Sequence, residues 1–244
     1  MNLKYALKNG FDFNEKEATT IIIVSALSGF ILSFRRWGVE EFDATEGISN
    51  LIKFSIMFLI LFFLFIYTQK VTAITMGLDA RMHLWKYGPP LGVLVTIMSY
   101  GVIPFVFLGG VKLTEIPRLR LGKFRRTAIN IKEMLIIGLV GPMVLLFLSL
   151  LVFFPLYLAS ESSTFMNLIW ITSIILVVSA LPLPSLNGLN LLLKYRSAWV
   201  IYFLYTLILY GLLQILMNPL MYALALILAL IGAFIIKKIM DKKF

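Results

Sequence analysis

Long apolar stretches recur along the chain and are separated by short polar or charged segments. About 20 apolar residues suffice to cross a hydrocarbon core of about 30 Å, and six stretches approach that length. The predicted spans cover residues 18–34, 50–68, 134–158, 166–184, 198–216 and 219–236. This pattern predicts an all-α polytopic membrane protein.

A seventh apolar stretch, 89–110, lies between the second and third spans and is bounded by Pro89-Pro90 and Gly109-Gly110. If it crosses the membrane, the better orientation leaves 15 basic residues inside and 6 outside. If it enters and returns on one side, 19 lie inside and only Arg35 and Arg36 outside. Because Lys and Arg gather in cytoplasmic loops, we predict a re-entrant hairpin and cytoplasmic termini. Partial alternation predicts short β-strands at 78–87 and 109–116, flanking the hairpin.

The chain has 244 residues, of which 60% are hydrophobic, and a net charge of +10 without any cysteine. Cytoplasmic loops and anionic lipid account for the positive charge without a nucleic acid partner. A basic cluster either fixes topology or binds anionic headgroups or an acidic partner: Arg118, Arg120, Lys123, Arg125 and Arg126. We predict a cytoplasmic N-terminal segment (1–17), one membrane domain (18–236) and a basic cytoplasmic tail (237–244).

Candidate chemistry is sparse. The predicted spans carry almost no ionisable group, which argues against an ion-coupled transporter. His83 is the single histidine, whereas a zinc site needs three or four protein ligands. Two polar features interrupt the apolar pattern. The apolar stretch 51–77 contains a polar turn, Tyr67 to Lys70, and the sequence LPLPSLNG (181–188) breaks a helix and places a polar side chain at membrane depth.

Four segments in this order resemble the site-2 protease family of intramembrane zinc metalloproteases, in particular its archaeal branch. They are VTAITMGLDARMHLWKYGP (71–89), FVFLGGVKL (105–113), KEMLIIGLVGPMVLL (132–146) and LPLPSLNG (181–188). The resemblance implies a site-2-protease-like core over about 50–195, with extra helices at 18–34, 198–216 and 219–236. The family's core has a His-Glu-x-x-His helix, an embedded hairpin, a Gly-Pro helix and a helix ending in an Asp that completes the zinc site.

At the positions that correspond to the zinc motif this chain has Phe65, Ile66 and Gln69, and Asn187 takes the place of the Asp. Phenylalanine has no lone pair, neutral amides are poor ligands, and Ile66 cannot act as a base. The resemblance therefore implies vestigial positions, no bound metal or cofactor, and no peptidase activity.

The expected function is that of a catalytically inactive site-2-protease-like protein of the cell membrane. Its partners would be the lipid bilayer and other membrane proteins or transmembrane segments, as a binding protein or a subunit of a membrane complex. Two alternatives stay open. One is a lipid-modifying enzyme that uses Glu115 or Glu133 with the basic loop, and the other is a transporter or channel.

Overall fold

The computed structural model describes residues 9–10, 12–37, 42–115, 120–121, 124–125 and 129–241. The chain divides into two compact units, Met1–Val144 and Leu145–Phe244, and we treat each unit separately. Whether they form one membrane domain stays a prediction. The predicted basic cluster (Arg118, Arg120, Lys123, Arg125, Arg126) has its side chains outside the described part, as do the ends of the predicted terminal segments (1–8 and 242–244).

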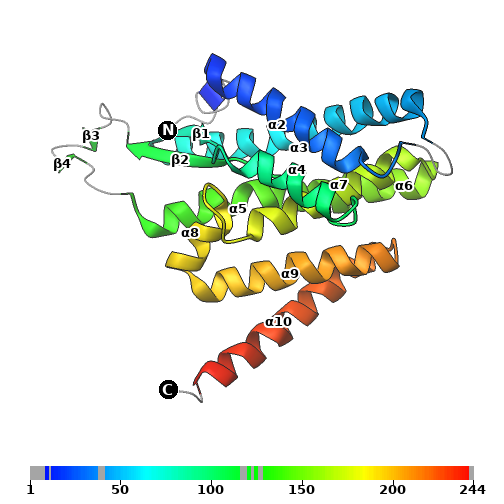
Figure 1. Ribbon diagram of the computed structural model, residues 1–244. Coiled ribbons are helices and arrows are strands. Elements are labelled where there is room, and N and C mark those ends of the chain that lie inside the picture. Colours follow the sequence, from blue (N-terminus) through cyan, green and yellow to red (C-terminus); the bar gives the residue numbers. More distant parts are fainter. Residues whose placement is uncertain are drawn as a thin grey trace. The chain divides into compact units, whose positions relative to one another are not determined.

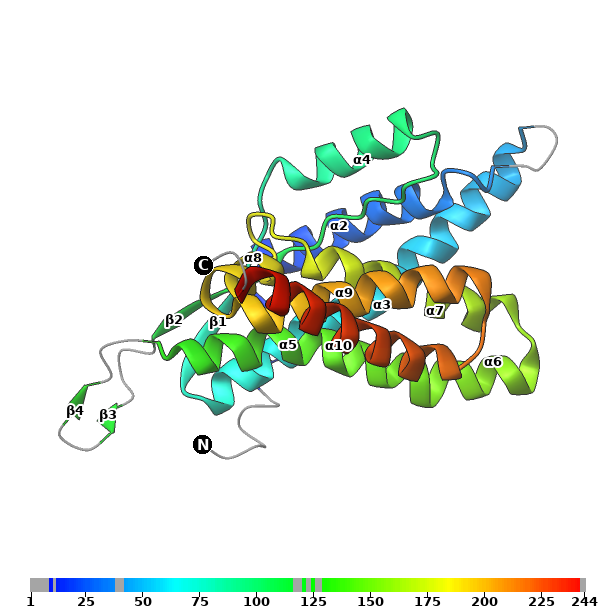
Figure 2. The same cartoon turned by 90° about the horizontal axis from the view of Figure 1, so that it is seen from below.

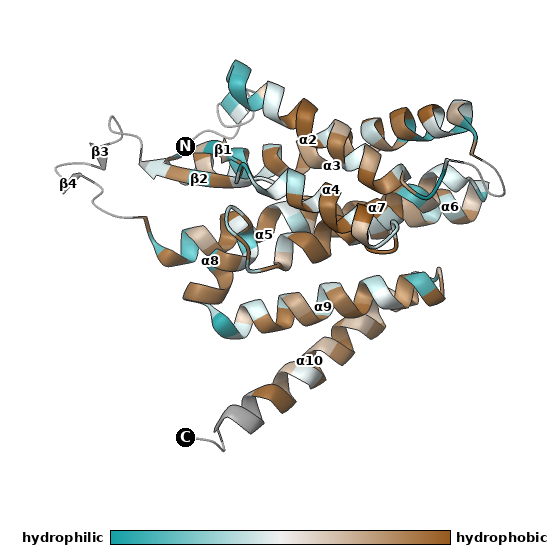
Figure 3. Cartoon of the chain, in the orientation of Figure 1, coloured by the Kyte–Doolittle hydropathy of each residue, from teal (hydrophilic) through white to brown (hydrophobic). Residues whose placement is uncertain are grey.

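Five helical segments of the described chain are long and apolar enough to cross a membrane: Glu15–Ser33, Ala44–Thr75, Ile131–Ser160, Ser163–Ala180 and Arg196–Ile215. They overlap the first five predicted spans, and most of their residues are apolar (Figure 3). The sixth predicted span is also helical, as α10 (Leu220–Asp241), but its apolar described part, Leu220–Ile236, is shorter than the other five. The chain therefore has the helices of a polytopic membrane protein.

The first unit is built on α2 (Glu15–Ser33) and α3 (Ala44–Thr75), which lie side by side in Figures 1 and 2. They approach closely because Gly29 of α2 has no side chain. A Cβ at this position would collide with Ser55 of α3. α3 has 32 residues, so it is about 48 Å long at 1.5 Å per residue. It is thus much longer than the predicted span 50–68. Asp43 caps its N-terminus, since its carboxylate accepts hydrogen bonds from the backbone N–H groups of Thr45 and Glu46.

Two short strands join the polar end of α3 to the hairpin, as predicted. β1 (Leu78–His83) pairs antiparallel with β2 (Gly110–Glu115), and His83 lies opposite Gly110. The ends of the intervening segment are therefore neighbours, so residues 84–109 leave the sheet and return to it. The prediction of a hairpin with flanking strands is confirmed. Farther along, β3 (Arg120–Leu121) and β4 (Phe124–Arg125) form a second, two-residue ladder.

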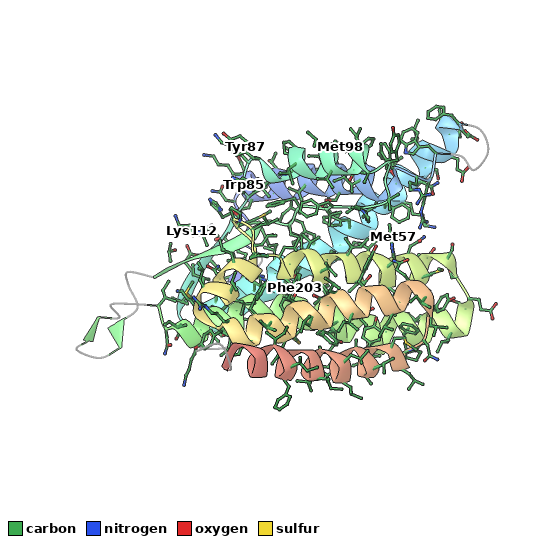
Figure 4. The ribbon with its side chains drawn as sticks, turned by 60° about the horizontal axis from the view of Figure 1, so that its bottom comes forward. Met57, Trp85, Tyr87, Met98, Lys112 and Phe203 are labelled. Atoms are coloured by element: carbon green, nitrogen blue, oxygen red, sulfur yellow. The ribbon has the colours of Figure 1, made fainter. Side chains whose placement is uncertain are left out.

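The hairpin consists of α4 (Gly88–Met98), a turn and an extended return. Gly88 and Gly92 let the return pack directly on α4, since a Cβ at either would collide with Phe107 or with the carbonyl of Phe105. Trp85 stacks edge-on to Tyr87 and also contacts Phe107, with ring centroids 5.9 Å apart in both pairs. Figure 4 shows Trp85 and Tyr87 near the start of α4 and Met98 near its end.

The hairpin runs along the whole length of α2. At its base the backbone N–H of Met82 donates to the carboxylate of Glu17, near the start of α2. At its tip Gly101 packs so closely on Phe34 and Arg35, just after the end of α2, that a Cβ would collide with them. Gly101 has φ = +72°, a conformation that glycine adopts without strain. Because α2 has 19 residues, a length of about 28 Å, the hairpin is long enough to pass through most of a bilayer.

The second unit contains the end of α5 (Ile131–Leu148), a π-helical turn (Ser149–Phe153), α6 (Phe154–Ser160), α7 (Ser163–Ala180), α8 (Asn187–Lys194), α9 (Arg196–Ile215) and α10. Its core gathers around Phe154, Leu176 and Leu209. In the π-helical turn the Ser149 hydroxyl shares a hydrogen bond of 2.6 Å with the Tyr222 hydroxyl of α10. Such a turn in a long helix re-aims side chains locally, here toward α10.

Candidate functional site

The predicted site starts on α3, where Phe65, Ile66 and Gln69 are all buried, with exposed fractions of 1%, 0% and 0%. Gly141 of α5 packs against this turn of α3. A Cβ at Gly141 would lie 2.9 Å from Gln69 Nε2 and 2.9 Å from the carbonyl oxygen of Phe65. Gly141 directly precedes Pro142, so the contact joins the turn of α3 that carries Phe65 and Gln69 to the Gly-Pro segment named in the resemblance.

Gln69 has an unusual environment. It is fully buried, and neither atom of its side-chain amide has a hydrogen-bond partner within the described chain. Burying an amide without partners costs free energy, because the water that solvated it is not replaced. The site is therefore a packed apolar contact with one unsatisfied amide in it.

We expect Gln69→Met to raise the free energy of unfolding by about 1 kcal/mol, because it keeps the volume and removes the unsatisfied amide. Unfolding by SDS in mixed micelles would measure the change. Gln214→Met is the matched control, since Gln214 lies on α9 and is exposed, and it should leave stability unchanged. A loss of stability in Gln69→Met alone would contradict the description of this amide as unsatisfied.

Asn187 is the first residue of α8 and is 7% exposed. The helix break predicted from LPLPSLNG is confirmed, since α7 ends at Ala180 and Ser185 has φ = +67°. Gly188 is required there, because a Cβ would collide with the carbonyls of Ala180 and Leu181. Trp199 Nε1 also donates to the Ala180 carbonyl, at 2.9 Å.

The structure brings Phe65, Ile66 and Gln69 together on one helix of the first unit and places Asn187 in the second unit. The convergence of all four positions stays a prediction. His83 is exposed at the end of β1 and pairs with Gly110 through the backbone. Within the described ranges, no three His, Cys, Asp or Glu side chains gather in a group that could hold a metal ion.

The structure describes the side chain of one of the two glutamates named for a lipid-modifying enzyme, Glu133, and not that of the other, Glu115. Glu133 lies in the first turn of α5 and accepts from the backbone N–H of Asn130 at 3.1 Å, and Asn130 Oδ1 accepts from the N–H of Lys132 at 3.0 Å. This reciprocal arrangement caps the helix. Glu115 ends β2, and its side chain lies outside the described part.

A buried ion pair lies next to the predicted spans 18–34 and 50–68, on the two helices that extend beyond them. Lys70 Nζ of α3 lies 3.1 Å from Glu17 Oε2 of α2, and the side chains are 3% and 7% exposed. Glu17 is the last residue of the predicted N-terminal segment (1–17), and Lys70, the last residue of the polar turn, follows the predicted span 50–68. Both belong to the helices, because α2 begins at Glu15 and α3 continues to Thr75.

Hydrogen bonds surround this pair. Glu17 Oε1 accepts from the backbone N–H of Met82 at 2.6 Å, and Oε2 accepts from that of Asn14 at 3.0 Å. Lys70 also donates to the Asp12 carbonyl at 2.8 Å and lies 3.9 Å above the ring of Phe13. The pair therefore ties α2, α3 and β1 together at the base of the hairpin.

A second ion pair lies at the rim of this cluster. Arg81 Nε donates to Asp79 Oδ2 at 3.1 Å, and both side chains are more than 40% exposed. This hydrogen bond raises the pKa of the Arg81 guanidinium. One sequence signal pointed to the buried cluster: Asn14 followed three residues later by Glu17 is a helix-start signature that places Glu17 inside the helix.

Comparison of the chain with protein-family models, with curated proteins and with solved structures found no match.

Proposed function

We propose that this protein is a catalytically inactive, site-2-protease-like membrane protein that binds transmembrane segments or serves as a subunit of a membrane complex. The observation that carries the proposal is the contact of Gly141 with Phe65 and Gln69. It joins two segments that the resemblance assigns to the core, and the hairpin lies between them in the chain. Phe65 and Ile66 are fully packed there, as interiors generally are.

The chemistry of these side chains supports inactivity. Phe65 and Ile66 offer no atom that could bind a metal or take a proton, and an amide such as that of Gln69 is a poor zinc ligand. An active peptidase of this type needs ligands and a general base together. A chain with the core and without these groups retains the capacity to bind a helix and loses the capacity to cut it.

We expect the triple variant Phe65→His, Gln69→His and Asn187→Asp to bind one zinc ion per chain, whereas the wild type binds none. The substitutions restore the two histidines, four residues apart on one helix face, and the third ligand. The zinc content of the purified, monodisperse protein would be measured by inductively coupled plasma mass spectrometry.

The matched control is Ile60→His and Leu64→His with Asn187→Asp, which keeps the spacing but places the histidines on another face of α3. It should bind no stoichiometric zinc. A folded triple variant without zinc would show that the positions do not converge, and zinc in the wild type would refute the assignment of an empty site.

Partner binding has its own test. Purification in two unrelated detergents should retain the same membrane protein at a fixed ratio to this chain. A strictly monomeric chain in both detergents would contradict the proposed role in a complex, whatever the zinc result.

A further inference from the structure

A cavity of about 720 Å³ lies between the start of α9 and the end of α10. α9 and α10 lie next to each other near their connection and separate toward the C-terminus (Figure 1). The helices are close at Gly232, where a Cβ would lie 3.3 Å from Leu204 Cδ1. The cavity lies beside this contact, and its lining runs from Lys194 to Ile201 on one side and from Leu230 to Ile236 of α10 on the other.

The mouth of the cavity is basic. Lys194, Arg196 and Ser197 line it, and all three are exposed. The described part of the chain contributes no acidic side chain to the lining. An anion at the mouth would therefore meet two cationic side chains and a hydroxyl, and a guanidinium binds phosphate oxygens in a bidentate manner.

The interior of the cavity is apolar. Val200 and Ile201 form the wall on α9, and Ala233 and Phe234 form the wall on α10. Phe234 is 68% exposed. The lining of α9 ends at Ile201, five residues after Arg196, so the apolar part extends about 8 Å along α9 from the charged mouth.

We propose that this cavity binds an anionic phospholipid, with the phosphate at Lys194 and Arg196 and an acyl chain between α9 and α10. The volume lies within the range of about 300–1,000 Å³ of small-molecule sites. A transmembrane helix would need a groove along the full length of both helices, whereas this cavity ends after about two turns. The charge pattern predicts that the mouth faces the cytoplasm, where anionic lipids concentrate and basic pockets between helices bind their headgroups.

The test is binding of dioctanoyl-phosphatidylglycerol to the delipidated full chain in detergent, compared with dioctanoyl-phosphatidylcholine and glycerol 3-phosphate. Phosphatidylglycerol should bind at least about tenfold more tightly than either. Lys194→Gln with Arg196→Gln should weaken its binding roughly 25-fold, since one basic residue beside an anionic lipid contributes about fivefold. Ala233→Trp, which fills the apolar interior, should weaken it without changing the charge.

Lys16→Gln with Lys132→Gln is the charge-matched control, because both lysines are exposed and belong to other helices. This control should bind phosphatidylglycerol as the wild type does. Equal binding of phosphatidylcholine, or equal weakening in both charge variants, would overturn the proposal as non-specific attraction. Glycerol 3-phosphate binding as tightly as the lipid would overturn it as a simple anion site.

Discussion

Lys70→Met should lower the free energy of unfolding by about 3 kcal/mol, the largest loss we expect from a single substitution. It leaves the Glu17 carboxylate buried without its ammonium partner, and breaking a buried pair costs about 3–5 kcal/mol. We place the loss at the lower end because Met82 and Asn14 still donate to the carboxylate. SDS unfolding in mixed micelles would give the difference.

Two controls separate pairing from other effects. Glu17→Gln with Lys70→Met removes both charges, so it should recover most of the loss. Asp79→Asn breaks the neighbouring exposed pair with Arg81 and leaves Arg81 Nη1 in place, 3.9 Å from Glu17 Oε2, so it should cost less than about 1 kcal/mol. If Lys70→Met costs no more than Asp79→Asn, the pair does not tie α2, α3 and β1 together.

Gly141→Leu should lower the free energy of unfolding by about 2–3 kcal/mol, because it forces α5 away from α3. Even the first added carbon would lie 2.9 Å from the Phe65 carbonyl, a backbone atom that cannot rotate away. Overpacking of this kind typically costs about 1–3 kcal/mol. SDS unfolding in mixed micelles would measure the loss.

Gly211→Ala is the matched control, since nothing lies within 4 Å of a Cβ at this position of α9. It should raise stability by up to about 1 kcal/mol through helix propensity alone. A Gly141→Leu variant as stable as the wild type would mean that α5 does not pack on the turn of α3 that carries Phe65 and Gln69, and would remove the observation that carries the proposed function.

The sequence predicted the helices, the helix break before Asn187 and the hairpin. Each depends on a property of the sequence itself: the length of an apolar run, the lack of an N–H in proline, or the distribution of Lys and Arg among the loops. The hairpin was predicted from charge asymmetry rather than from hydropathy. The pairing of His83 with Gly110 shows that its two ends meet, and its entry into the membrane from the cytoplasmic side stays a prediction. These properties can be counted along the chain without knowing which distant segments touch, so a single sequence reveals them.

Which face of α3 is buried could not be read from the sequence. Ile56 and Ile60 are 53% and 59% exposed, whereas Phe58 and Leu61 are fully buried. All four are large and apolar, because lipid and protein interior both favour such side chains. A helix that is apolar all round carries no periodicity to mark its packed face.

Tertiary packing alone decided two contacts: that of Gln69 with Gly141 in the candidate site, and the buried ion pair of Glu17 with Lys70 nearby on α3. Glu17 and Lys70 are 53 residues apart in the chain, and Gln69 meets Gly141 across two helices. From the sequence of an apolar run alone, a polar residue at its end is expected to lie in a loop. Only the packing of α2, β1 and α5 around α3 turns Lys70 into a buried partner and Gln69 into an unsatisfied amide, because burial depends on segments distant in the chain.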